Sequence, residues 1–250
     1  MDTHQRYWIA LYFWALLAVV MLPLLIKVRA PYGRHTRSGW GKMIDNHLGW
    51  FWMEVPALFV FPLFVIYGPA EKNWISWLLV FLWMLHYVNR TLIFPFRLRT
   101  GNKKMPLIIL IMGIVFNVIN GFFNGYYLGF INQPQADVIQ WHTVLGIVLF
   151  AGGMVINIIT DNKLIRLRKN GNGYSIPKGW LFQYISCPNH FGEIIEWIGF
   201  ALIAWNFPAF SFALWSFTNL LPRTLNHHAW YKETFPDYPK ERKAVIPLIL

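Results

Sequence analysis

Two carboxylates stand where an apolar run should enter a membrane, in the stretch "NHFGEIIEWIGF" at residues 189–200. Asn189 and Glu193 are four residues apart, and Glu196 follows on nearly the same side of the expected helix. The helix dipole favours an acid in the first turn, which explains Glu193 but not Glu196, one turn deeper. An amide and a carboxylate at this spacing can bond the hydroxyl or amide groups of a polar ligand.

A second polar pair lies at the end of the apolar run in "GMVINIITDNKLIRLRK", residues 153–169. Asn157 and Asp161 are four residues apart and share a face, and Arg168 follows two turns later if the helix continues. A polar helix end is the structural alternative, since cations near a helix C-terminus are ordinary. That alternative is weaker for Asn157, which still lies within the apolar stretch.

A third stripe combines a cation, an imidazole and a phenol, because Arg223, His227 and Tyr231 recur every four residues. A solvated helix end would produce the same pattern, but so would a site for a phosphate-bearing ligand. Together the three helix ends predict a polar cup that opens to the cytoplasm and suits a nucleotide cofactor. The sequence has no GxGxxG or GxxxxGK[ST] motif, so we expect the nucleotide to bind outside a Rossmann fold. It has no HExxH motif and no Cys/His spacing typical of zinc sites, so we expect no metal.

A separate polar group is expected deeper among the apolar runs. Glu54 lies in "GWFWMEVPALFVF", and the motif "HYVNRT" supplies His86, Tyr87 and Arg90. A Glu54–Arg90 pair that joins two helices is the structural alternative. The functional interpretation is that Glu54 and Tyr87 bond a polar atom of a ligand inside the helix bundle, because ionisable groups within apolar helices are usually functional.

The elements that would position these groups are membrane helices. The 250 residues are 56% hydrophobic and 18% aromatic, with only 13% charged, and several apolar runs approach the roughly 20 residues that span a bilayer. The runs are long and do not alternate, which predicts an all-α integral membrane protein with one domain, 1–250, rather than a β-barrel. The expected transmembrane helices are seven: 7–26, 48–67, 74–96, 105–123, 140–160, 190–206 and 208–226.

Most of the 22 Lys and Arg residues fall in four stretches, after the first, third, fifth and seventh expected helices. The positive-inside rule therefore places loops 27–47, 97–104 and 161–189 and the tail 227–250 in the cytoplasm, with the N-terminus outside or lumenal. The N-terminal run has no cleavage site and is expected to be a retained helix. Cys187 is the single cysteine, so an intrachain disulfide is impossible.

These motifs resemble the steroid 5-alpha-reductase family, and the sequence fits a bacterial or otherwise divergent member. The resemblance covers residues 48–250 and is carried by "WMEVP", "HYVNRT", "NGYYL", "GEIIEWIGFAL", "NHHAWYKETFPDYPKERKAVIPLIL" and the fifth-helix segment quoted above. It implies a seven-helix reductase that uses NADPH to reduce the C4=C5 double bond of a 3-oxo-Δ4 steroid to the 5-alpha product. Two departures stand out: the family has Arg where this chain has Ser175, and the mammalian enzymes have Arg where it has Met112.

The resemblance also implies site roles. Glu54 and Tyr87 would polarise the 3-oxo group as catalytic residues, and Trp50 and Phe116 would line the substrate pocket. The residues expected to contact NADPH are Asn157, Asp161, Arg168, Tyr174, Asn189, Glu193, Arg223, His227 and Tyr231. Since Glu54 can donate a hydrogen bond only when protonated, its apolar surroundings would help by disfavouring the charged carboxylate.

Two other functions remain open at this stage. The C-terminal third also loosely resembles membrane methyltransferases that use S-adenosylmethionine on a lipid or prenyl substrate. A non-enzymatic sterol-binding or transport protein would need the lipid pocket but not the polar cup. The expected partners are a hydrophobic steroid and membrane lipids, with no nucleic acid and a monomeric state favoured. The membrane would be a bacterial inner membrane or, in a eukaryote, the endoplasmic reticulum.

Overall fold

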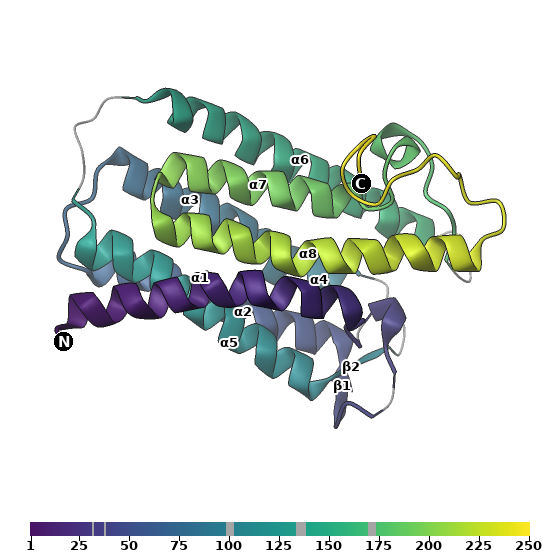
Figure 1. Ribbon diagram of the computed structural model, residues 1–250, viewed down its shortest axis with the longest axis horizontal. Coiled ribbons are helices and arrows are strands. Elements are labelled where there is room, and N and C mark those ends of the chain that lie inside the picture. Colours follow the sequence, from purple (N-terminus) through teal and green to yellow (C-terminus); the bar gives the residue numbers. More distant parts are fainter. Residues whose placement is uncertain (32, 38, 99–102, 134–138, 170–173) are drawn as a thin grey trace. The chain divides into compact units, whose positions relative to one another are not determined.

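The computed structural model describes residues 1–250 except 32, 38, 99–102, 134–138 and 170–173 (Figure 1). Each of the seven predicted helical segments is helical. The α-helices are α1 (Thr3–Lys27), α2 (Asn46–Tyr67), α3 (Trp74–Val88), α4 (Phe94–Arg97), α5 (Leu107–Tyr126), α6 (Trp141–Lys169), α7 (Pro188–Ala204) and α8 (Phe207–Thr234). Single π-helical turns extend α3 at Asn89–Ile93 and α5 at Tyr127–Ile131, and short 3₁₀ turns lie at Gly33–His35 and Trp180–Gln183.

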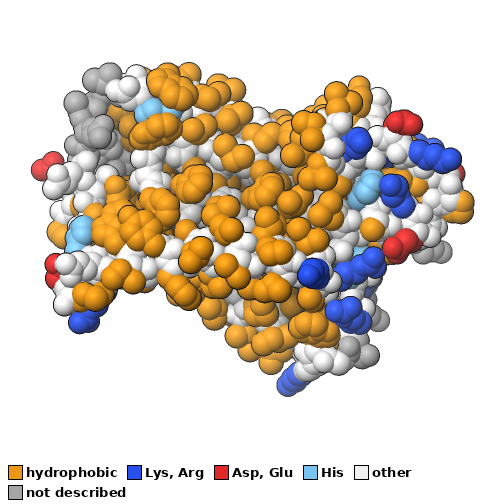
Figure 2. Space-filling view, viewed as in Figure 1, with side chains coloured by type: hydrophobic (Ala, Val, Ile, Leu, Met, Phe, Trp, Pro, Cys, Tyr) orange, Lys and Arg blue, Asp and Glu red, His pale blue; other side chains and the backbone are white. Residues whose placement is uncertain are grey.

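Five stretches of the described chain are long and apolar enough to cross a membrane: Thr3–Lys27, Asn46–Tyr67, Trp74–Arg97, Leu107–Ile131 and Trp141–Arg168. Many of their large apolar side chains are exposed, as a lipid-facing surface requires, among them Phe13, Phe59 and Phe81. Figure 2 shows hydrophobic side chains along α1 and α8, with Lys, Arg and His gathered toward the C-terminal part of α8. These features confirm an all-helical integral membrane protein.

Three predicted boundaries were wrong, each because a helix continues beyond it. The helix predicted to end near residue 123 runs on through the π turn to Ile131, across an apolar, aromatic segment. Helix α6 reaches Lys169, so the first part of the expected loop 161–189 is helical; residues 161–169 contain no Gly or Pro, and Leu, Lys and Arg favour helix. Helix α8 reaches Thr234, so residues 227–234 of the expected tail are helical too.

A small sheet interrupts the all-helical prediction. Strands β1 (Met43–Asp45) and β2 (Lys104–Pro106) pair antiparallel, with Met43 opposite Pro106 and Asp45 opposite Lys104. Asp45 also caps α2, because its carboxylate accepts hydrogen bonds from the backbone N–H groups of His47 and Leu48 at 2.9 and 3.0 Å. The pairing joins the start of α2 to the start of α5, far apart in sequence, so no local pattern could reveal it.

The chain forms two compact units. The first unit comprises Met1–Arg29, Leu145–Ala201 and Phe210–Leu250, and the second comprises Ala30–Val144 and Leu202–Ala209. In the first unit α1 and α8 lie side by side (Figure 1): the indole N–H of Trp215 donates to the carbonyl of Trp14 at 3.0 Å, and the two rings lie 4.6 Å apart. Helices α7 and α8 meet through Trp197 and Phe212, whose ring centroids are 4.5 Å apart.

Glycines let α6 and α7 approach each other closely in the first unit. A methyl group at Gly153 would overlap the carbonyl oxygen of Gly192 and the backbone nitrogen of Glu196. We expect Gly153→Ala to cost about 1–3 kcal/mol, because backbone atoms cannot rotate away as a side chain could. Gly152→Ala is the matched control, since nothing lies within 4 Å of its added methyl group. Thermal midpoints in detergent should fall for the first variant only; equal midpoints would contradict the close contact.

In the second unit α2 packs against both α3 and α5. Trp83 of α3 is fully buried, donates its indole N–H to the carbonyl of Ala57 at 2.8 Å, and stacks on Phe61 at 4.5 Å. On the other side, Gly121 and Gly125 of α5 lie against the Val60–Phe61 turn of α2. This packing holds α2 between two helices and fixes the side chains of its buried face.

Candidate functional site

Glu54 is buried in the second unit, where its carboxyl group meets an amide from another helix. Its side chain is 9% exposed, and its Oε2 accepts a hydrogen bond of 3.1 Å from Nδ2 of Asn117 on α5. The same nitrogen donates to the backbone carbonyl of Met53 at 2.8 Å. The carboxyl group is therefore enclosed and held between α2 and α5, away from bulk water.

Tyr87 is also buried in this unit, 4% exposed, with its ring 4.9 Å from that of Trp83. Trp50 is half-buried, and the guanidinium group of Arg90 lies 5.7 Å from its ring and 4.5 Å from that of Phe94. These cation–π contacts show where part of the Arg90 charge is stabilised, in addition to the Glu54–Arg90 pair weighed above. The structure thus places Glu54, Tyr87 and Trp50 in one unit.

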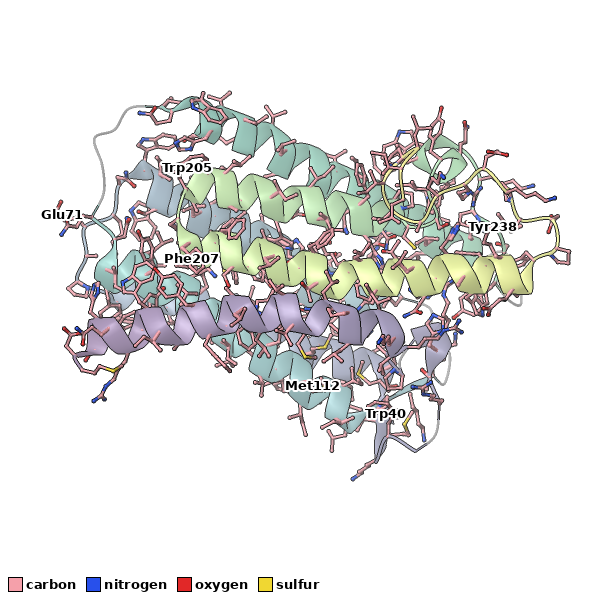
Figure 3. The ribbon with its side chains drawn as sticks, in the orientation of Figure 1. Trp40, Glu71, Met112, Trp205, Phe207 and Tyr238 are labelled. Carbon is pink, nitrogen blue, oxygen red and sulfur yellow. The ribbon has the colours of Figure 1, made fainter. Side chains whose placement is uncertain are left out.

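The two other substrate-related positions lie on α5. Phe116 is half-buried, one residue before Asn117. Met112 is 55% exposed on the same helix (Figure 3). An arginine at position 112 would therefore project from an exposed part of α5, whereas Phe116 stands beside the buried amide that contacts Glu54.

In the first unit, four of the predicted cofactor residues form one hydrogen-bonded network. The amide of Asn157 donates to the backbone carbonyl of Asn189 at 3.0 Å and to Oε2 of Glu193 at 3.3 Å. The amide of Asn189 in turn donates to Oδ1 of Asp161 at 3.1 Å. Asn157 and Asp161 are buried, at 3% and 7% exposure, while Asn189 and Glu193 are half-buried. Two same-face pairs predicted on separate helices thus interlock across α6 and α7.

Arg168 and Tyr174 are also brought together, since the guanidinium group lies 5.6 Å from the tyrosine ring. Tyr174 continues toward α8, where its ring meets that of Trp230 at 5.0 Å. Ser175, at the position where the family has Arg, is exposed. The helical extension of α6 is what carries Arg168 to this position, as the two-turn spacing predicted.

The third predicted stripe lies on α8. Arg223 and His227 are half-buried, and the His227 ring lies 5.7 Å from that of His190 on α7. Tyr231 is 3% exposed and stacks on Tyr238 of the tail at 5.4 Å, with the rings nearly parallel. The stripe therefore runs from partly accessible groups at Arg223 to a phenol covered by the tail.

Sequence reasoning missed several polar groups that contact the predicted ones. Asn117 and His190 both stood in view as polar residues, one in an apolar helix and one between Asn189 and Glu193. His190 Nδ1 lies 2.7 Å from the hydroxyl of Thr224, which itself donates to the carbonyl of Leu220 at 2.9 Å. Because the threonine proton is used there, Nδ1 of His190 carries the proton and donates to Thr224.

The tail after α8 folds back and is fastened by Ser186. The Ser186 hydroxyl lies 2.6 Å from Nδ1 of His228 and 2.6 Å from the Tyr238 hydroxyl, and it donates to the carbonyl of Lys243 at 3.0 Å. Tyr238, labelled in Figure 3, is 6% exposed, and the guanidinium group of Arg242 lies 4.9 Å from its ring. Burial raises the pKa of Tyr238 above its usual value, although Ser186 and Arg242 oppose this, so the phenol is neutral near pH 7.

This tail cluster should weaken in acid. Burial lowers the pKa of His228 below its usual 6.5, and the positive charges of Lys232, Arg242 and Lys243 lower it further. Since the folded protein holds this proton less tightly than the unfolded chain, the stabilisation is complete above pH 6.5 and is lost as the pH falls below it. Hydrogen exchange of residues 235–250 should rise between pH 7 and 5. His228→Gln should remove that pH dependence, and an unchanged profile in this variant would assign it to other groups.

Among the described residues, no group of three or more His, Cys, Asp and Glu side chains is placed to hold a metal ion. The polar groups instead offer amides, carboxylates and guanidinium groups. These are donors and acceptors for an organic ligand with hydroxyl, amide and phosphate groups, and they fit a nucleotide better than a cation.

Comparison with known proteins agrees with these observations. Residues 103–250 match the family model described as 3-oxo-5-alpha-steroid 4-dehydrogenase. The chain is 39% identical over 247 residues to the steroid 5-alpha-reductase DET2 of Gossypium hirsutum, covering 93% of this chain and 94% of that protein. The DET2 of Arabidopsis thaliana is 40% identical over 235 residues, with 90% of each chain covered.

An animal relative is equally similar. The 3-oxo-5-alpha-steroid 4-dehydrogenase 1 of Bos taurus is 39% identical over 244 residues, which cover 94% of this chain and 93% of that protein. The similarity thus extends over almost the full length of plant and animal proteins alike and includes both units. The protein described here belongs to the 3-oxo-5-alpha-steroid 4-dehydrogenase family.

Proposed function

We propose that this protein is a membrane-embedded oxidoreductase that reduces the C4=C5 double bond of a 3-oxo-Δ4 steroid to the 5-alpha product, with NADPH as the reductant. The single observation that carries the proposal is similarity at about 40% identity, over nine tenths of the chain, to proteins named for this activity. The buried Glu54 and Tyr87 and the hydrogen-bonded network of the first unit support it from the structure.

NADPH would be held by the first unit. Amides and carboxylates of Asn157, Asp161, Asn189 and Glu193 suit the ribose hydroxyls and the carboxamide of a dinucleotide. The guanidinium groups of Arg168 and Arg223 suit its phosphates. The ring stripe of Tyr174, His227 and Tyr231 supplies flat surfaces and further hydrogen-bonding atoms near them. When bound, NADPH supplies the hydride that C5 of the steroid accepts.

The residues of the second unit would act on the substrate carbonyl. As C5 accepts hydride, negative charge develops on the 3-oxo oxygen. The Tyr87 hydroxyl donates a hydrogen bond to that oxygen, and the Glu54 carboxyl group donates a second one in its protonated form. Donors fixed in a site without water stabilise such charge far more than water does. Trp50 and Phe116 would contribute apolar surface for the steroid rings.

We also propose that the chain spans the membrane seven times, with its N-terminus outside or lumenal. The basic loops and the polar cup would then face the cytoplasm, where NADPH is available. The apolar substrate would arrive from the lipid phase, which suits a molecule that hardly dissolves in water. The membrane would be the inner membrane in a bacterium or the endoplasmic reticulum in a eukaryote, and the protein would act as a monomer.

The test is NADPH oxidation by the purified protein in detergent, with testosterone or progesterone as substrate and product identification by mass. A product heavier by two hydrogens, together with consumption of NADPH, is the expected result. If NADPH stabilises the protein but neither steroid reacts, the substrate is a different enone. If S-adenosylmethionine stabilises it and NADPH does not, the proposed reaction is wrong.

A further inference from the structure

Asn117 makes an unusual pair of contacts for a residue in an apolar helix. It is 5% exposed, and its Nδ2 lies 2.8 Å from the carbonyl oxygen of Met53 and 3.1 Å from Oε2 of Glu54. A backbone carbonyl can only accept, so the amide nitrogen, not the amide oxygen, must face this side. The contact with Glu54 is therefore also a donated hydrogen bond, and Oε2 is its acceptor.

The contacts fix a choice that a protonated carboxyl group otherwise leaves open. A carboxylic acid has one O–H and one carbonyl oxygen, and rotation about its last torsion exchanges them at little cost. A donor held against Oε2 favours the arrangement with the carbonyl oxygen there and the proton on Oε1. Since Met53 and Glu54 are neighbours on α2, the Met53 carbonyl keeps the amide in register with the carboxyl group.

We propose that Asn117 is a positioning residue for the reduction: it holds Oε2 of Glu54 as an acceptor and so keeps the proton on Oε1, which donates to the substrate carbonyl. The inference rests on the proposed role of Glu54. It adds a residue of α5 to the machinery, one that donates no hydrogen bond to the substrate and acts only through the orientation of Glu54. It also gives a reason for a buried asparagine where lipid and core favour apolar side chains.

Two neighbouring asparagines on α5 provide the contrast. The amide of Asn120 donates to the carbonyl of Phe116 at 2.8 Å, and the amide of Asn124 donates to the carbonyl of Asn120 at 3.0 Å. Both of these bonds stay within the helix, whereas the Asn117 amide reaches α2. Asn124, 3% exposed, is thus a matched control: it has the same residue type, helix and burial, without this contact.

The experiment compares Asn117→Leu with Asn124→Leu. Leucine has nearly the volume of asparagine but donates no hydrogen bond. We expect kcat to fall about tenfold in Asn117→Leu, as the loss of one buried hydrogen bond implies, with KM for steroid and NADPH within about twofold of wild type. Asn124→Leu should leave kcat within about twofold. Asn117→Ser, whose shorter side chain cannot bridge to Glu54, should repeat the result if the leucine variant does not fold.

A second readout separates positioning from a general structural role. The saturated 3-oxo steroid and the same steroid without the 3-oxygen are compared as competitive inhibitors. We expect the wild-type preference for the 3-oxo compound to shrink severalfold in the Asn117 variants and to persist in Asn124→Leu. Equal weakening of both inhibitors would show a merely structural role and overturn the inference.

The outcome also distinguishes this inference from the proposed function. If a Glu54→Leu variant is inactive while the Asn117 variants keep wild-type kcat and inhibitor preference, only the role of Asn117 is wrong. If Glu54→Leu keeps wild-type kcat, the assigned role of Glu54 fails, and the role of Asn117 fails with it.

Discussion

Replacing Glu54 with leucine is expected to lower kcat about 100- to 1000-fold, because the reaction loses one of two donors to the 3-oxo oxygen. Glu54→Gln should fall between this variant and wild type, since an amide still donates a hydrogen bond but is a much weaker acid than a carboxyl group. The measurement is the rate of product formation at saturating NADPH and steroid, with product mass as the readout.

The control for this variant is cofactor binding. Glu54 lies in the second unit and is separate from the network that is proposed to bind NADPH, so the thermal shift caused by NADPH should match that of wild type. Loss of turnover together with loss of the NADPH shift would indicate misfolding instead of a catalytic role. A kcat within threefold of wild type in Glu54→Leu would remove Glu54 from the mechanism.

Replacing Glu193 with alanine is expected to raise the NADPH concentration for half-maximal rate about 10- to 100-fold, the range for hydrogen bonds to a charged group. The carboxylate accepts from Asn157 at 3.3 Å and is half-buried, so it is fixed by the protein yet partly open to a ligand. KM for the steroid should change by less than threefold.

Glu233→Gln is the matched control for Glu193→Ala. It also removes one negative charge from the first unit, but Glu233 lies on the surface, where it pairs with Arg29 at 3.3 Å. Its KM for NADPH should stay near the wild-type value. If Glu193→Ala raised both KM values equally, or if Glu233→Gln had the same effect, a specific contact between Glu193 and the cofactor would be ruled out.

The sequence predicted the helices well because lipid leaves a chain few options and apolar runs are easy to recognise. It predicted Asn157 with Asp161, and Asn189 with Glu193, because residues four apart share a helix face. It could not predict that Asn157 reaches Glu193 and Asn189 reaches Asp161. Those bonds depend on how closely α6 and α7 approach, which the glycines at 153 and 192 allow.

The partner of Glu54 shows a different limit. Charge suggested Arg90, the nearest cation by sequence pattern, and the spacing of "HYVNRT" made that pairing reasonable. The structure adds an uncharged amide, Asn117, from a helix whose polar residues had not been considered. Long-range pairs such as β1 with β2, or Ser186 with Tyr238 and Lys243, are equally invisible to local patterns.

The two π-helical turns have a consequence for how this chain tolerates changes in length. An α-helix turns about 100° per residue, so deleting one residue rotates everything beyond it relative to everything before it. A π turn holds one residue more than an α turn, and a deletion within Asn89–Ile93 or Tyr127–Ile131 can relax it to ordinary helix. The extra residue near Tyr87 thus sets the angular phase between the two halves of that helix. One residue fewer there would keep the helix intact but turn Phe94 and the residues after it onto a different side.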